Sequence, residues 1–159
     1  MSPKNSKIKV GISCGDPNGI GLEALADALA DERTLASMIP VVFAPRSVAE
    51  DSFENVTWSE VDEAKNAEAG QINVVTFEAD DFEHKPGEPS KEAGAVAMKG
   101  LEIAVAHLAK TAVDVLVTAP INKKAMQMAD FPFVGHTEYI TSEFKTKDSL
   151  MLMVSDALK

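Results

Sequence analysis

The chain has 159 residues, of which 45% are hydrophobic, and acidic residues outnumber basic ones by 25 to 15, giving a formal net charge of −10. This length and apolar content suffice for one domain with a buried core and exclude a disordered chain. The negative charge disfavours nucleic acid and anionic membrane surfaces as partners, although a few local donors can still bind one phosphorylated small molecule.

The cellular compartment is predicted from cysteine content and from the lack of apolar targeting segments. Cys14 is the single cysteine, so no disulfide can form within the chain. No apolar region follows the polar N-terminus, and no apolar run reaches the length of about 20 residues that a membrane span needs. We expect a cytoplasmic protein in a reducing environment.

Strands and helices alternate along the first half of the sequence. Short apolar runs predict strands at residues 7–13, 40–44 and 72–77. A helical period follows the first run, and a weaker one spans residues 45–53, whereas residues 54–70 have no clear pattern. The residues of the first helical stripe, spaced i, i+3, i+4 and i+7, are Leu22, Leu25, Ala26 and Leu29.

The second half continues this alternation. An acidic loop at residues 79–89 leads to Ser90, which is placed to cap a long helix. The apolar stripe of that helix consists of Leu101, Ala104, Val105 and Leu108. Residues 114–118 predict a parallel strand covered on both faces. Short helices should begin near Asn122 and Thr137. The whole pattern predicts an α/β fold with a largely parallel sheet.

The end of the sequence suggests a longer parent protein. Residues 149–154 predict a last strand, and residues 155–157 predict a turn, after which only two residues remain. Because a strand needs a partner, we expect the chain to be a fragment of a longer protein.

Residues 15–23, GDPNGIGLE, form a glycine-rich turn between a strand and a helix. Such a turn brings backbone N–H groups, and here Asp16, to the edge of the sheet, where an anion or a substrate can bind. A tight turn that requires a positive φ explains the glycines equally well. The spacing matches neither the dinucleotide fingerprint nor a Walker A loop.

Residues 118–126, TAPINKKAM, directly follow the predicted parallel strand at 114–118. Ligands bind at the carboxyl ends of strands in open α/β sheets, so Asn122 and Lys123 are candidate active-site residues. A solvated helix start is the alternative for Lys123, and it is the preferred interpretation for Lys124.

Residues 131–140, FPFVGHTEYI, place His136 and Thr137 at a predicted helix start. The imidazole, the hydroxyl and a backbone N–H can all donate to a phosphate or carboxylate. A structural histidine and a simple N-cap threonine are the alternatives. His84 and His107 lack zinc-type spacing to His136, so no complete metal site is expected within this chain.

Taken together and in this order, GDPNGIGLE, GEPSKEAG, TAPINKKAM and FPFVGHTEYI resemble the 4-hydroxythreonine-4-phosphate dehydrogenase family of vitamin B6 biosynthesis. The resemblance implies an isocitrate/isopropylmalate dehydrogenase-like three-layer α/β/α fold, of which this chain holds only the N-terminal part. It further implies a homodimer, NAD or NADP as cofactor, and a divalent metal (Zn, Mg or Co).

The resemblance also implies a reaction and a set of site residues. Family members oxidise 4-phosphooxy-L-threonine, and loss of CO2 then gives 3-amino-2-oxopropyl phosphate. The family's substrate contacts match His136 and Thr137, and Lys123 lies in a typical family motif. The metal-binding histidines and most of the cofactor site belong to sequence beyond residue 159, so the chain alone is expected to be inactive.

Three alternatives remain open at this point. A related dehydrogenase of D-threonate or D-erythronate 4-phosphate shares the same N-terminal motifs. A phosphate-binding module without catalysis, or a structural and interaction domain, would also fit the pattern.

Overall fold

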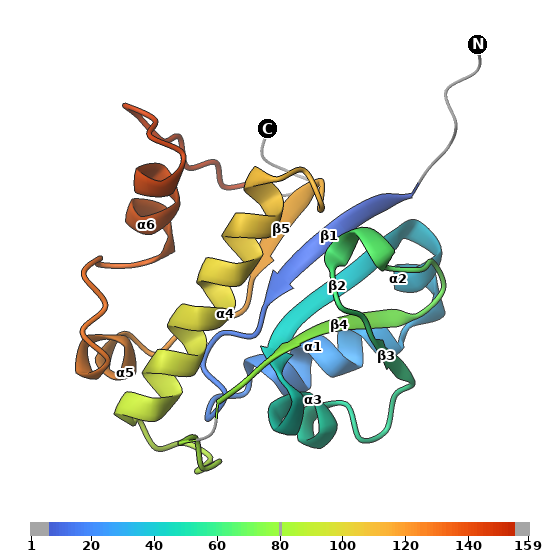
Figure 1. The fold of residues 1–159 in the computed structure, drawn as a ribbon, viewed down its shortest axis with the longest axis horizontal. Helices are drawn as coiled ribbons and strands as arrows, with labels where there is room; N and C mark the ends of the chain where they lie inside the picture. The colour runs from blue at the N-terminus through green and yellow to red at the C-terminus, as the bar shows by residue number, and fades with distance from the viewer. Residues whose placement is uncertain (1–6, 80, 155–159) are drawn as a thin grey trace.

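The computed structural model describes residues 7–79 and 81–154, in which a parallel sheet lies between helices (Figure 1). The strands of these residues pair in the order β3-β4-β2-β1-β5, and every pairing is parallel. This arrangement confirms the predicted α/β fold. The strands are β1 (Ile8–Ser13), β2 (Met38–Pro45), β3 (Trp58–Glu60), β4 (Ile72–Phe77) and β5 (Val115–Thr118).

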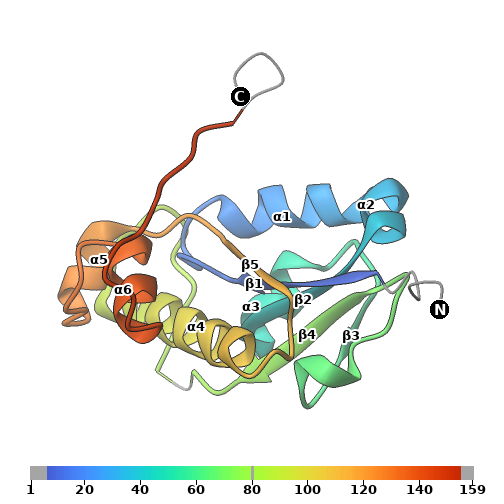
Figure 2. The same cartoon turned by 90° about the horizontal axis from the view of Figure 1, so that it is seen from above.

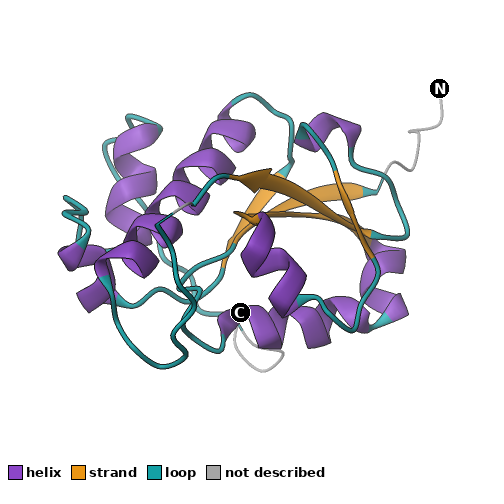
Figure 3. Cartoon of the chain, turned by 60° about the horizontal axis from the view of Figure 1, so that its bottom comes forward, coloured by secondary structure: helices purple, strands orange, loops and turns teal. Residues whose placement is uncertain are grey.

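The helices cover both faces of the sheet (Figure 2, Figure 3). Leu22 of α1 and Val48 of α3 join the core on one face, whereas Ala104 of α4 packs against the other face. Helices α5 and α6 lie beside α4. The helices are α1 (Gly21–Ala30), α2 (Glu32–Ser37), α3 (Arg46–Ser52), α4 (Lys91–Ala109), α5 (Lys123–Met128) and α6 (His136–Glu143), with a 3-10 turn η1 (Ala64–Asn66).

Side-chain alternation along the central strands explains the two core layers. Val10 and Ile12 of β1 contribute to the α1 side, together with Val42 of β2. The neighbouring residues Val41 and Phe43 point to the other side and pack near α4. Both faces of β2 are therefore apolar and buried, as expected for a central parallel strand.

Helix α4 starts as the sequence predicts. The Ser90 hydroxyl accepts a hydrogen bond from the backbone N–H of Ala93 at 3.0 Å, and Glu92 lies in the first turn near the positive end of the helix dipole. The predicted stripe is confirmed, because Leu101, Ala104 and Val105 are buried. Since α4 joins β4 to β5, it crosses the sheet and carries the chain to the far side of β1.

The prediction that residues 114–118 form a strand covered on both faces is wrong in its second part. β5 forms, but it lies at the end of the sheet and pairs only with β1 within the described residues. Val115 and Val117 are 44% and 48% exposed. The apolar sequence correctly predicted a strand, but only one face of β5 is covered: Leu116 packs against the α4 side, whereas Val115 and Val117 on the α1 side are exposed.

The prediction of a strand at residues 149–154 is also wrong. This segment has no regular secondary structure. Leu150, Leu152 and Met153 are exposed, so an apolar composition alone does not produce a strand without a partner. Residues 155–157, predicted as a turn, lie outside the described part of the chain.

Some short elements have no clear sequence pattern. α2 begins where Asp31 accepts a hydrogen bond from the backbone N–H of Arg33, and β3 and η1 fall in the unassigned stretch at residues 54–70. Across residues 7–79 and 81–154, no helix combines the length and apolar character needed to cross a membrane.

Candidate functional site

His136 and Thr137 are the first two residues of α6. Gly135 occupies the N-cap position in an extended conformation, and no side chain caps the helix. The first backbone N–H groups of a helix have no acceptor within the helix, so they are free to bind an anion. His136 thus lies beside a surface that favours negative charge.

An aromatic cluster fixes the start of α6. Phe133, three residues before His136, and Tyr139, three residues after it, have ring centroids 5.5 Å apart. Phe131 lies 5.5 Å from Phe133 and 5.7 Å from Tyr139. Phe131 and Tyr139 are buried in the same cluster as Leu101 of α4. The apolar flanks of the FPFVGHTEYI motif therefore position its two polar residues.

His136 has an unusual environment for a surface helix start. The side chain is half-buried, and its Nε2 atom is buried without a hydrogen-bond partner among residues 7–79 and 81–154. Burial lowers the pKa of His136, because a desolvated imidazolium is disfavoured. A neutral ring with an unpaired polar atom is unfavourable unless a ligand or another protein group completes it.

Asn122 and Lys123 lie at the start of α5, close to the carboxyl end of β5. The Asn122 side chain accepts hydrogen bonds from the backbone N–H groups of Lys124 at 3.1 Å and Ala125 at 3.2 Å. Asn122 is therefore the helix cap, and this role explains an asparagine at this position without requiring a ligand. Lys123 is exposed and free to approach one.

Asp16 lies in the turn after β1, and both its carboxylate and its backbone N–H make hydrogen bonds within the protein. Its carboxylate accepts a hydrogen bond from the backbone N–H of Asn18 at 3.0 Å, and its own N–H donates to the Pro120 carbonyl oxygen at 2.9 Å. Gly15 has φ +68° and faces Pro120 without room for a Cβ atom. The glycine at position 15 is thus explained by a tight turn and close backbone packing.

Asn18 was not singled out from the sequence, although it makes the most contacts in this turn. It is 3% exposed, and its side chain accepts from the Lys85 N–H at 2.9 Å and donates to the Glu88 carbonyl oxygen at 2.8 Å. The Asn18 carbonyl oxygen also accepts from the Gly87 N–H at 2.7 Å. Its partners lie about 70 positions away in sequence, so no local pattern identifies them.

The structure brings only some of the candidate residues together. The turn with Asp16 and the loop that leads to Asn122 meet at Pro120. Thr137 lines a shallow groove of about 490 Å³ on α6, but none of the other four candidates lines that groove. In this chain the candidates therefore form two surfaces, one at the carboxyl ends of β1 and β5 and one at the start of α6.

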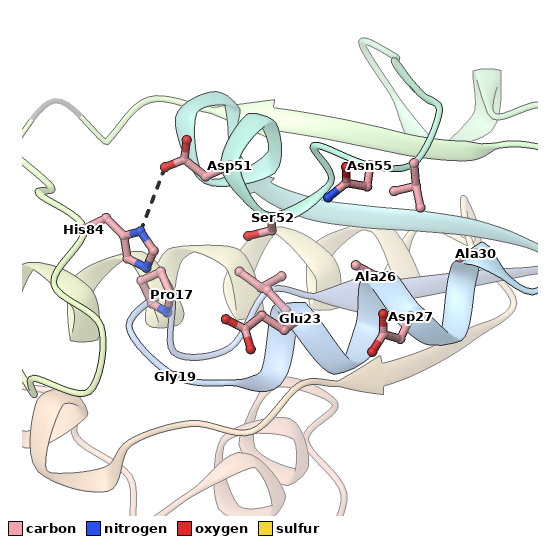
Figure 4. Close-up of a pocket in the computed structure, with 12 residues that line it drawn as sticks. Pro17, Gly19, Glu23, Ala26, Asp27, Ala30, Asp51, Ser52, Asn55 and His84 are labelled. Carbon is pink, nitrogen blue, oxygen red and sulfur yellow. Dashed lines mark ion pairs between the residues drawn. The ribbon is translucent and has the colours of Figure 1, made fainter.

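A separate hollow of about 390 Å³ lies between α1, α3 and the loop that carries His84 (Figure 4). Its polar lining includes Glu23, Asp27 and Asp51, and His84 Nδ1 lies 3.9 Å from an Asp51 carboxylate oxygen. None of the five candidate residues lines this hollow. It is thus distinct from both surfaces.

The described residues do not fit a metal or dinucleotide site. Within residues 7–79 and 81–154, no group of three or more His, Cys, Asp or Glu side chains could bind a metal ion. The glycine-rich turn after β1 lacks the dinucleotide spacing, and its N–H groups at Asp16 and Asn18 are already paired. No step of a reaction is therefore assigned to a metal or cofactor held by these residues.

Comparison with known proteins identifies relatives that match most of the chain. The profile of the family described as "Pyridoxal phosphate biosynthetic protein PdxA" matches residues 34–159. A 4-hydroxythreonine-4-phosphate dehydrogenase of Bacteroides thetaiotaomicron is 33% identical and matches 96% of this chain. A protein of Halalkalibacterium halodurans, provisionally named D-threonate 4-phosphate dehydrogenase, is 32% identical and matches 93% of it.

The fold is similar to that of a solved relative. The crystal structure of 4-hydroxythreonine-4-phosphate dehydrogenase from Klebsiella pneumoniae superposes with a TM-score of 0.84 over 98% of this chain, at 27% identity. The matched region covers 49% of that structure, and 44% and 46% of the Bacteroides and Halalkalibacterium proteins. The chain thus spans slightly less than half the length of these relatives.

Proposed function

Since this chain belongs to the PdxA family of pyridoxal phosphate biosynthetic proteins, we propose that it is the N-terminal half of a dehydrogenase for 4-phosphooxy-L-threonine. The complete enzyme would transfer a hydride from the substrate's 3-hydroxyl carbon to NAD or NADP and release the hydroxyl proton. The resulting β-keto acid would lose CO2 to give 3-amino-2-oxopropyl phosphate. The chain alone is proposed to be inactive.

One observation links this proposal to particular residues: at the start of α6, the buried Nε2 atom of His136 and the first helical N–H groups have no side-chain partner within the described residues. The family profile includes this segment, and the names of the relatives specify phosphorylated hydroxy-acid substrates. A phosphate or carboxylate would accept a hydrogen bond from the imidazole and from the free N–H groups of the helix. This interaction would satisfy the Nε2 atom, which has no partner in the described part of the chain.

Within this proposal, the residues of the chain bind and orient the substrate. His136 donates to an anionic oxygen in its neutral form, and Thr137 adds a hydroxyl donor at the exposed surface. Lys123 is the proposed positive charge at the carboxyl end of β5. Asn122 fixes the backbone that carries Lys123 by capping α5.

In the complete enzyme a divalent metal would supply Lewis-acid chemistry and a nicotinamide cofactor would supply a hydride acceptor. We propose that the ligands of this metal, and most of the cofactor site, belong to the second half of the enzyme. We further propose that the complete enzyme is a cytoplasmic homodimer.

D-threonate 4-phosphate is a second candidate substrate, because a relative of nearly equal identity carries that name. Both substrates present a phosphate and a secondary hydroxyl, so the groups placed at α6 do not separate them. 4-Phosphooxy-L-threonine has an amino group where D-threonate 4-phosphate has a hydroxyl. The complete enzyme would have to recognise this difference elsewhere.

The binding part of the proposal can be tested on the 159-residue chain. The test is an NMR titration with 4-phosphooxy-L-threonine, with D-threonate 4-phosphate and with inorganic phosphate, observing the His136 ring and the Thr137 amide. We expect both to shift with a dissociation constant of the order of 1 mM, as suits an incomplete site. His136→Ala should abolish the shift at Thr137 while leaving the spectrum of the core unchanged.

The matched control is His84→Ala, which removes a histidine that lies in the hollow between α1 and α3. This variant should bind as the unmodified chain does. If no phosphorylated compound shifts the His136 and Thr137 signals, or if His136→Ala unfolds the chain, the histidine is structural and the proposed site is wrong.

A further inference from the structure

Asn18 and Gly19 form the single Asn-Gly pair of the sequence. Such a pair is chemically labile, because glycine has no side chain to hinder attack of its nitrogen on the side-chain carbonyl carbon of the asparagine. A bond forms from that carbon to the Gly19 nitrogen, the bond to the side-chain nitrogen breaks, and ammonia leaves with the proton of the Gly19 N–H. Water then opens the cyclic imide to aspartate or isoaspartate.

The fold holds both reacting groups in other contacts. The Gly19 N–H donates to the Asp16 carbonyl oxygen at 3.1 Å. The Asn18 side chain is buried, its oxygen accepts from the Lys85 N–H at 2.9 Å, and its nitrogen donates to the Glu88 carbonyl oxygen at 2.8 Å. Cyclisation requires the side chain to turn toward the Gly19 nitrogen and that nitrogen to lose its proton. All three hydrogen bonds must therefore break first.

The loop that holds Asn18 is an exposed one. Lys85, Gly87 and Glu88 are all exposed, although their backbone groups pair with Asn18. Exposed loops open at a lower cost in free energy than the core strands and helices. Local opening of residues 85–88 would thus release the Asn18 side chain while the sheet stays folded.

We propose that Asn18 is a modification site, at which opening of the loop at residues 85–88 controls deamidation. The proposal does not depend on the proposed function. Aspartate places a carboxylate oxygen against the Glu88 carbonyl oxygen. Isoaspartate adds a methylene group to the main chain, which displaces the carbonyl oxygen that accepts from the Gly87 N–H at 2.7 Å. Either product disturbs the contacts that protected the asparagine, so the modified turn no longer closes as before.

Peptide mapping by mass spectrometry tests the proposal on the 159-residue chain. The chain is incubated at mildly alkaline pH, folded or in urea, and the conversion of Asn18 to an acid is followed over time. In urea, Asn18 should be the first asparagine to react. In the folded chain its conversion should be at least about tenfold slower, because only the open form reacts.

Gly19→Ala is the control for the chemistry. A Cβ atom at this position would lie 3.4 Å or more from its nearest neighbours, so the fold accommodates it. The added methyl group hinders attack by the nitrogen. Conversion of Asn18 in urea should therefore be slower in this variant than in the unmodified chain.

Two glycine variants test whether the loop controls the reaction. Gly87 has φ +78° and Gly70 has φ +85°, and no atom lies within 4 Å of a Cβ built on either. Valine at each position introduces a similar backbone strain without a clash. Gly87 belongs to the loop that contacts Asn18, whereas Gly70 precedes β4 at the opposite edge of the sheet.

We expect Gly87→Val to speed the conversion of Asn18 in the folded chain by about fivefold or more, as strain of this kind allows. Gly70→Val should leave the rate nearly unchanged. Equal conversion in folded and urea-unfolded chains, or earlier reaction of another asparagine in urea, would overturn the proposal. Equal acceleration by both valine variants would reject control by the loop. If Gly87→Val does not fold, Gly87→Ala and Gly70→Ala form the same comparison.

Discussion

Gly94 of α4 faces Ala125 of α5 so closely that a Cβ atom at position 94 would overlap the Ala125 carbonyl group. This contact allows the backbones of the two helices to approach each other, and it sets the position of α5 next to the long helix. Because α5 begins with Lys123, a packing requirement in the KEAG motif fixes the placement of a proposed active-site residue in the TAPINKKAM motif.

We therefore expect Gly94→Ala to destabilise the chain, although alanine is the better helix former. Helix propensity alone would stabilise the variant by about 1 kcal/mol. Overpacking against backbone atoms opposes this gain, and such changes typically cost about 1–3 kcal/mol. Urea unfolding should show a net loss of stability. The control is Ala95→Gly at the exposed neighbouring position, which should lose only the propensity difference, and a more stable Gly94→Ala would show that the helices can separate without cost.

Asn18→Ala tests the connection between the turn after β1 and the loop that precedes α4. The change removes the acceptor of the Lys85 N–H and the donor to the Glu88 carbonyl oxygen. Leaving such groups unpaired should lower the free energy of unfolding by about 2–3 kcal/mol. In hydrogen exchange, the Lys85 amide should lose its protection.

Asn18→Asp tests the two hydrogen bonds of the Asn18 side chain separately. It keeps an acceptor for the Lys85 N–H but places a carboxylate oxygen against the Glu88 carbonyl oxygen. The Lys85 amide should therefore remain protected while stability still falls. Loss of protection at Lys85 in both variants would mean that the loop depends on the asparagine's shape rather than on these hydrogen bonds. Asn55→Ala, at an exposed position, should change stability by less than about 0.5 kcal/mol.

The burial of His136 predicts a pH dependence of stability. Its pKa in the folded chain lies below the ordinary value of 6.5, so the unfolded chain binds the proton first as the pH falls. Between the folded pKa and 6.5 the unfolded state carries more protons, and the free energy of unfolding decreases as the pH decreases. Well above pH 6.5, His136 is neutral in both the folded and the unfolded state. It then contributes nothing to the pH dependence of the free energy of unfolding.

Urea unfolding of the chain and of His136→Gln, at a series of pH values from 7 downwards, measures this effect. The variant should show a shallower decline of stability below pH 6.5, because it cannot take up the proton. Thr137→Val, next to it on α6, removes no titratable group and should decline as the unmodified chain does. An identical decline in His136→Gln and the unmodified chain would contradict the burial of the ring.

The sequence predicted those helices and strands that depend on residues close together in the chain. Residues 72–77 form β4 because they are rich in β-branched side chains, and Ser90 caps α4 because its hydroxyl accepts from an N–H three residues later. The exposure of Val117 could not be predicted, because it depends on which helix lies over β5. A run such as VLVT has the same composition whether both faces are covered or only one.

The candidate site also has features that the sequence predicted and features that it could not predict. The glycine before His136 and the apolar residues around it predicted a helix start, and α6 begins there. The burial of the His136 Nε2 atom depends on tertiary packing, which the spacing of residues in the motif does not specify. The separation of Asp16 from the groove lined by Thr137 was likewise not predictable, since it reflects how α5 and α6 lie beside α4.

The apolar segment before residue 155 provides the last test, because its sequence favours a strand and the structure shows none. Leu152 is 72% exposed, whereas Leu101 of α4 is 1% exposed and packs with Phe131 and Tyr139. Leu152→Ser should therefore change the free energy of unfolding by less than about 0.5 kcal/mol. Leu101→Ala should lower it by about 2–5 kcal/mol, because a cavity remains in the core. A loss above 1 kcal/mol in Leu152→Ser, measured by urea unfolding at low protein concentration to limit association, would show that the segment packs against the domain in solution.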